Sequence, residues 1–191
     1  MKGMLIGGLL GGLVMFFWGF VAHVLLPLGE SALIEATPAQ QDAVLASVKE
    51  NFQSGPGVYI VPMDKAAMQD KEKAKAFGER ALANPYAFVV YQPQGRDMLN
   101  NMGGNLGIEW ATNTVSALLA AFLVSFAAVG FGRKVLLVLT IGIFGWVANA
   151  VPMWNWYRFP TDFTVSTLIE QGVGWLLAGI VIAWALKRFS R

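Results

Sequence analysis

The chain contains no cysteine and only one histidine, His23, in its 191 residues. Without cysteine there can be no disulfide framework, no thiolate nucleophile and no metal site built from sulfur ligands. A single histidine also excludes the histidine pairs that hold haem iron or zinc in many proteins. The sequence therefore predicts no metal site.

The common catalytic and nucleotide-binding motifs are missing as well. The chain has no GxSxG, no HExxH and no P-loop. The glycine-rich stretch 103–107 is followed by no Lys-Ser/Thr pair, so it lacks the side chains of a phosphate cradle. We expect a protein that is not an enzyme and that carries no cofactor. A Ser–His pair or a carboxylate pair stays open as the catalytic alternative, because Glu109 and Glu170 can be neighbours.

Charged residues are scarce, at 14% of the chain, whereas soluble domains contain about a quarter. The charges lie between or beyond four apolar runs, at 4–28, 110–131, 135–153 and 165–186. A hydrocarbon core of about 30 Å needs roughly 20 helical residues, so each run is long enough to span it. The first run exceeds the apolar part of a cleavable signal peptide, which has about 7–15 residues, and we expect it to be retained.

Each apolar run has one end that is flanked by cations and by no acidic residue. The cations found there are Lys2, Arg133, Lys134, Lys187, Arg188 and Arg191, and all twelve Asp and Glu residues fall on the other side. Because positively charged flanks stay cytoplasmic, both termini are predicted inside and residues 29–109 outside. The same asymmetry accounts for the net charge of +2, so we expect no nucleic-acid partner.

The predicted fold is an α-helical integral membrane protein, a four-helix transmembrane bundle with a small α/β extracytoplasmic domain between helices 1 and 2. The predicted segments are 1–28 for helix 1, 29–109 for the external domain, and 110–131, 135–153 and 163–187 for helices 2–4. An external domain without cysteine, in a chain without an Asn-x-Ser/Thr sequon, favours the bacterial cytoplasmic (inner) membrane.

The external domain shows two strand signals on either side of a helix signal. Thr37-Pro38 begins a first helix, with Thr37 as its N-cap. Residues 58–61 and 87–91 are apolar runs typical of strands, and 64–84 is predicted to be one charged helix between them. This order suggests a βαβ crossover, right-handed if the strands are parallel. Two strands alone make a poor sheet, so a helix, the membrane face or a second copy must cover it.

Glycines recur at four-residue spacing in the first apolar run. The set comprises Gly3, Gly7, Gly8, Gly11 and Gly12. Small residues at this spacing form a groove in which another helix backbone can pack closely. Two readings stay open: a seam for a homo-oligomer or a partner membrane subunit, or packing against the other helices of the same chain.

Polar side chains collect at the predicted outer edge of the helices: His23, Glu109, Asn113, Asn149, Arg158 and Glu170. A charge within a transmembrane segment is costly and usually pairs with another group. Arg158 is the nearest candidate partner for Glu170, and His23 is the second. The cluster either binds a ligand, a proton or a cation, or it ties the outer loops to the helices.

Aromatic residues mark the same level. Trp110, Trp154, Trp156 and Tyr157 are predicted to form an interfacial belt, and Trp146, in mid-run, to be a core residue. From these patterns we expect a non-enzymatic accessory or interaction subunit of a membrane complex, whose external domain faces a partner. The alternative is a small-ligand, lipid or ion-handling membrane protein that uses the polar cluster around Glu170.

Overall fold

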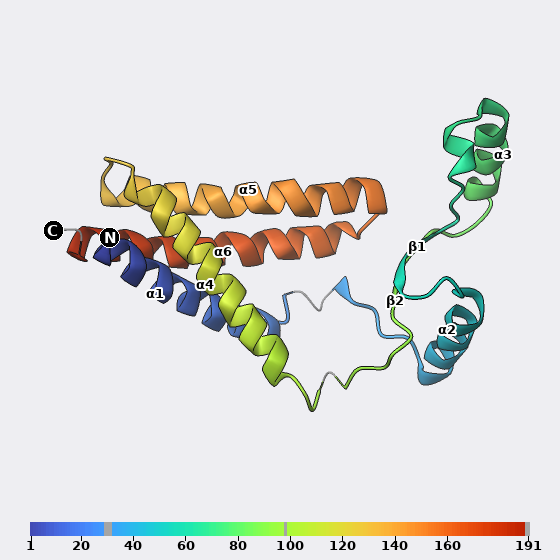
Figure 1. Ribbon diagram of the computed structural model, residues 1–191, viewed down its shortest axis with the longest axis horizontal. Coiled ribbons are helices and arrows are strands. Elements are labelled where there is room, and N and C mark those ends of the chain that lie inside the picture. The colour runs from blue at the N-terminus through green and yellow to red at the C-terminus, as the bar shows by residue number, and fades with distance from the viewer. Residues whose placement is uncertain (29–31, 98, 190–191) are drawn as a thin grey trace. The chain divides into compact units, whose positions relative to one another are not determined.

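Four helices are long and apolar enough to cross a membrane (Figure 1). They are α1 (Lys2–Phe20), continued by a π-helical turn η1 (Val21–Leu25), α4 (Gly103–Ser125), α5 (Phe131–Tyr157) and α6 (Thr161–Phe189). The structure, a computed structural model, describes residues 1–28, 32–97 and 99–189. The flanking cation Arg191 and the first residues of the predicted external domain, 29–31, lie outside the described residues. The chain divides into two units, Met1–Ile34 with Met98–Arg191, and Glu35–Asp97.

In the helical unit, α1 packs against α4 and α6, and α6 also packs against α5. Most of the buried side chains at these contacts are small or β-branched, among them Ala117, Ala121, Ala178 and Ile182. α4 runs obliquely across α1 and diverges from α5 beyond their short connection (Figure 1). The four helices are thus packed in the order α4, α1, α6, α5, with little contact between the two ends of this series.

The helix boundaries differ from those predicted by hydropathy. α4 begins at Gly103, well before Trp110, and it ends at Ser125. Lys134 closes this end, because its Nζ donates hydrogen bonds to the carbonyl oxygens of Val124 at 3.1 Å and Ala127 at 2.7 Å. A cation at a helix C-terminus stabilises the unpaired carbonyl groups there. α5 and α6 extend beyond their apolar runs at both ends.

The second unit contains α2 (Pro38–Asn51), β1 (Gly57–Val61), a 3₁₀ turn η3 (Ala66–Met68), α3 (Lys71–Leu82) and β2 (Ala87–Tyr91). Thr37 caps α2 as expected: its Oγ1 accepts from the Gln40 amide at 3.4 Å, and Gln40 Oε1 accepts from the Thr37 amide at 2.9 Å. This reciprocal pair is a capping box.

The predicted βαβ crossover is wrong, because β1 and β2 are antiparallel, with Val58 opposite Val90 and Ile60 opposite Phe88. Antiparallel strands need no crossover over the sheet, so the segment between them is free to fold separately. The single helix expected at 64–84 is also wrong. It is interrupted at Asp70, whose side chain accepts from the amides of Glu72 and Lys73 and so begins α3.

Three aromatic rings pack together in this unit. Phe52, which follows α2, stacks on Tyr59 with ring centroids 4.0 Å apart, and Tyr91 meets both rings edge-on. Tyr59 donates a hydrogen bond to the Gly55 carbonyl at 2.7 Å. The apolar side chains of α2 are largely exposed, including Val44 at 60%.

Candidate functional site

The structure pairs Glu170 with His23, the second of its two expected partners. His23 Nε2 lies 3.2 Å from Glu170 Oε1. Trp18 Nε1 donates to the backbone carbonyl of the same Glu170 at 2.9 Å. Both contacts connect the end of α1 and the π turn η1 to α6. Inserted π turns are often found at functional sites, but here the side chain that η1 presents fixes two helices together.

The other members of the polar cluster do not converge on this pair. Asn113 donates to Glu109 Oε1 at 3.0 Å, one turn away on the same helix α4. Asn149 donates to the Gly145 carbonyl of its own helix at 2.8 Å. Arg158 ends α5 in a left-handed conformation, with φ of 56°. Glu109 and Glu170 therefore have separate partners, and among the described residues no group of three His, Asp or Glu side chains could hold a metal ion.

The glycine face of α1 is occupied by helices of the same chain. A Cβ on Gly8 would lie 2.7 Å from Leu118 Cα of α4, and one on Gly12 would overlap the backbone of Thr114. On α6, Ile182 lies against both Gly7 and Gly11. Gly3 is buried as well. This is the second of the two readings that the sequence left open, so a partner subunit would need a different surface from this one.

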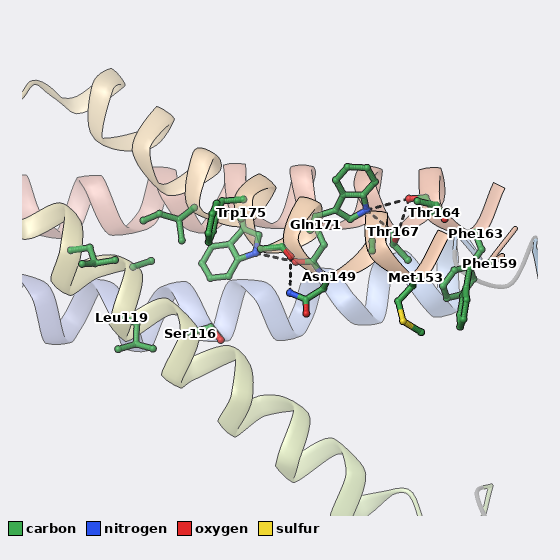
Figure 2. Close-up of a pocket in the computed structure, with 18 residues that line it drawn as sticks. Ser116, Leu119, Asn149, Met153, Phe159, Phe163, Thr164, Thr167, Gln171 and Trp175 are labelled. Atoms are coloured by element: carbon green, nitrogen blue, oxygen red, sulfur yellow. Dashed lines mark hydrogen bonds between the residues drawn. The ribbon is translucent and has the colours of Figure 1, made fainter. Parts of the chain in front are cut away.

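A cavity of about 690 Å³ lies between α4, α5 and α6, on the side where α4 and α5 diverge (Figure 2). α4 contributes Ser116, Leu119, Ala120 and Leu123. α5 and α6 contribute most of the remaining lining: Gly142, Gly145, Trp146, Asn149, Met153, Phe163, Thr164, Thr167, Gln171 and Trp175. We call this cavity the lateral groove. It has the size of a small-molecule site, and no charged side chain lines it among the described residues.

Two tryptophans form the polar wall of the lateral groove. Trp175 of α6 fits against Gly142 of α5, where any side chain larger than hydrogen would overlap the indole ring. Its Nε1 donates to Gln171 Oε1 at 3.0 Å. Trp146 Nε1 lies 3.2 Å from the Thr164 carbonyl and 3.1 Å from Thr167 Oγ1. Each indole thus binds a polar group of α6, which fixes the wall of the groove.

Asn149 is the only residue of the predicted polar cluster that lines this groove. Hydropathy alone indicated Trp146 as a core residue, whereas it lines the cavity. One signal was present in the sequence: Thr167, Gln171 and Trp175 follow at helical spacing inside an apolar run, with Thr164 just before it, and so share one face of a helix. The position of α4 beside that face carries no comparable signal.

Comparison of the chain with protein-family models, with curated proteins and with solved structures finds no match.

Proposed function

We propose that this protein is a non-enzymatic, multi-pass accessory subunit of the bacterial cytoplasmic membrane, whose external unit binds a protein partner. Both termini are cytoplasmic, and the unit Glu35–Asp97 is extracytoplasmic. The four helices anchor the chain in the lipid bilayer. The external unit supplies the surface through which the subunit acts.

The lack of a hydrophobic core in the external unit carries this proposal. Domains of about 60 residues bury about 60% of the surface that their unfolded chain exposes. Here Ala67 is the only buried hydrophobic residue among the described residues of the unit, and neither α2 nor α3 has a buried residue. A unit that buries so little apolar surface gains little free energy from folding by itself. A partner that covers the exposed apolar surface supplies what the unit lacks.

The β-ribbon offers the best-defined surface for such a partner. Val58 and Val90 are directly opposite each other in the register, and their side chains are 59% and 65% exposed. In the described chain the sheet has two strands, and no third strand pairs with either of them. An extended segment of a partner can add to an edge of this sheet and pack on the valine pair.

The distribution of charge supports the proposed orientation. One end of the helices carries Lys2 at the start of α1, Arg133 in the first turn of α5, and Lys187 and Arg188 in the last turn of α6. In Figure 1 this is the end marked N. Glu109, Asp162 and Glu170 belong to the other end of α4 and α6. Positive flanks on the cytoplasmic side are the common pattern of membrane proteins.

Site-specific photo-crosslinking in the native membrane tests the proposal. A benzophenone amino acid is placed at Val58 or at Val90 in the full-length chain, and at Lys75 of α3 as the exposed control. We expect a discrete protein adduct from Val58 and Val90 that is absent from Lys75, and its mass distinguishes a second copy from a different protein. If all three positions give the same diffuse adducts, or none, the ribbon is not a partner surface.

A further inference from the structure

The lateral groove contains two amide groups, on Gln171 and Asn149, that the protein satisfies only in part. An indole N–H can only donate, so the Gln171 atom that contacts Trp175 Nε1 is the amide oxygen. The Gln171 NH₂ group is therefore directed elsewhere, and no described residue accepts a hydrogen bond from it. A backbone carbonyl can only accept, so Asn149 presents its NH₂ to Gly145. Its Oδ1 receives no hydrogen bond from the described residues.

Both amides lie well inside their helices. At 1.5 Å per residue, Asn149 is about 12 Å from the end of α5 at Tyr157, and Gln171 is about 15 Å from the start of α6 at Thr161. In a helix that spans a membrane, these depths fall within the hydrocarbon layer. An amide without a hydrogen-bonding partner is costly in hydrocarbon. The groove thus offers the NH₂ group of Gln171 as a donor and Oδ1 of Asn149 as an acceptor, in surroundings without charge.

The rim of the groove is apolar on the side where α4 and α5 diverge. Leu119 and Leu123 of α4 are 60% and 56% exposed, and Phe144 of α5 is 72% exposed. Figure 2 shows Leu119 on the α4 side, with Asn149 and Gln171 between α5 and α6. A molecule held here has a polar part at the amides and apolar chains that leave between α4 and α5.

We propose that the lateral groove binds an uncharged glycerolipid that carries both an ester carbonyl and a free hydroxyl, as diacylglycerol does. The ester carbonyl accepts from the Gln171 NH₂, and the hydroxyl donates to Asn149 Oδ1. The absence of cationic side chains from the lining disfavours phosphate-bearing lipids, whose charge would be desolvated without a counter-ion. A quinone, with acceptors only, can accept from the Gln171 NH₂ but supplies no donor to Asn149 Oδ1. The groove lies in the helical unit, so this binding is independent of any partner of the external unit.

The probe is a diacylglycerol with a diazirine in one acyl chain, added to the full-length protein in vesicles of phosphatidylcholine. After irradiation, we expect labelled peptides from α4, α5 and α6 around Leu119, Phe144 and Gln171. Unlabelled dioctanoylglycerol should compete, while phosphatidic acid with the same chains should not. Equal competition by phosphatidic acid, or labelling spread evenly over all four helices, overturns the proposal.

Two kinds of variant locate the binding. Gly145→Leu places a large side chain in the groove, at a position where a Cβ meets nothing within 4 Å. Gly19→Leu is the control, because a Cβ at Gly19 also meets nothing within 4 Å but lies outside the groove. Gly145→Leu should abolish labelling, and Gly19→Leu should leave it unchanged. Unchanged labelling of a folded Gly145→Leu protein contradicts the site.

The second variant combines Gln171→Met with Asn149→Leu, because a thioether keeps a weak acceptor for Trp175. The loss of two hydrogen bonds predicts labelling reduced by about tenfold or more. Asn113→Leu removes an amide that lies outside the groove and should have no effect. If Asn113→Leu reduces labelling as much as the double variant does, the amides of the groove do not recognise the lipid. These amide variants decide the question even if Gly145→Leu does not fold.

Discussion

The two units of this chain differ in how much of their apolar surface they bury by contacts within the chain. In the helical unit, glycines on α1 let α4 and α6 approach so closely that a single Cβ would collide with the neighbouring helix. In the unit Glu35–Asp97, which we propose to be external, Ala67 of the 3₁₀ turn η3 is the one buried hydrophobic residue among the described residues. The first unit owes its structure to contacts within the chain. The second has few such contacts, and this contrast predicts very different responses to substitution.

The largest effect is expected from Gly12→Leu, because its Cβ would overlap the backbone of Thr114, which cannot move aside as a flexible side chain can. Ordinary overpacking costs about 1–3 kcal/mol, and a backbone collision should exceed that range. We expect no folded protein to accumulate in the membrane. Gly19→Leu, where a Cβ meets nothing within 4 Å, is the matched control, and its yield and unfolding should resemble the wild type. Equal behaviour of the two variants would show that α1 does not pack on α4.

The next largest effect separates the two units directly. Ile182 is fully buried between α1 and α6, so Ile182→Ala should lower the free energy of unfolding by about 2–5 kcal/mol. Val90→Ala removes a side chain that is 65% exposed and should change it by less than about 0.5 kcal/mol. Unfolding of purified protein in mild detergent measures both: tryptophan fluorescence follows the helical unit, which holds every tryptophan, and amide hydrogen exchange in β1 and β2 follows the ribbon. Similar losses from both substitutions would mean that the ribbon has a core of its own.

A smaller effect is expected at the contact between His23 and Glu170. The two side chains are 51% and 18% exposed, and partly exposed pairs contribute about 1 kcal/mol or less. A double-mutant cycle with His23→Leu and Glu170→Leu, in the same unfolding assay, should give a coupling energy of that size. A coupling energy near zero would leave Trp18 as the main link between this part of α1 and Glu170.

The smallest global effect is expected from Thr37→Ala in the external unit. Loss of an N-cap costs a helix about 1 kcal/mol. Because α2 has no buried residue, this loss should stay local: amide exchange in α2 should accelerate several-fold while the Tm of the helical unit is unchanged. Ser is the matched control, since Thr37→Ser keeps the capping oxygen. A lower Tm for the Ala variant would show that the two units fold cooperatively.

The sequence predicts the parts of this molecule that depend on local patterns. Hydropathy predicts the four long helices, and the Thr37-Pro38 dipeptide predicts the start of α2. The direction of β1 and β2 was not predictable, because alternation of side chains is the same in both directions of pairing. The early start of α4 at Gly103 was missed since glycine has low helix propensity, and tertiary context overrides it here.

The lateral groove could not be predicted from the sequence for a different reason. It depends on the direction in which α4 leaves α5, and that direction is set where α4 crosses the glycines of α1. Glycine-mediated crossings are often steeply inclined, at about 40°. The glycines of α1 do not show, however, which helix packs against them. Asn149 was identified as a polar residue within an apolar run, while Gln171, which also lines the groove, was recognised only once the structure showed its hydrogen bond with Trp175.

Hydrogen–deuterium exchange of the full-length protein tests the contrast between the units most directly. In purified protein, the amides of α1 and α6 should be protected for hours, while those of β1 and β2 should exchange within seconds. In native membranes, where the proposed partner is present, the amides of β1 and β2 should become protected. If the ribbon is already as protected as α6 in the purified protein, the external unit is stable without a partner, and the account of this chain as a subunit completed by one is contradicted.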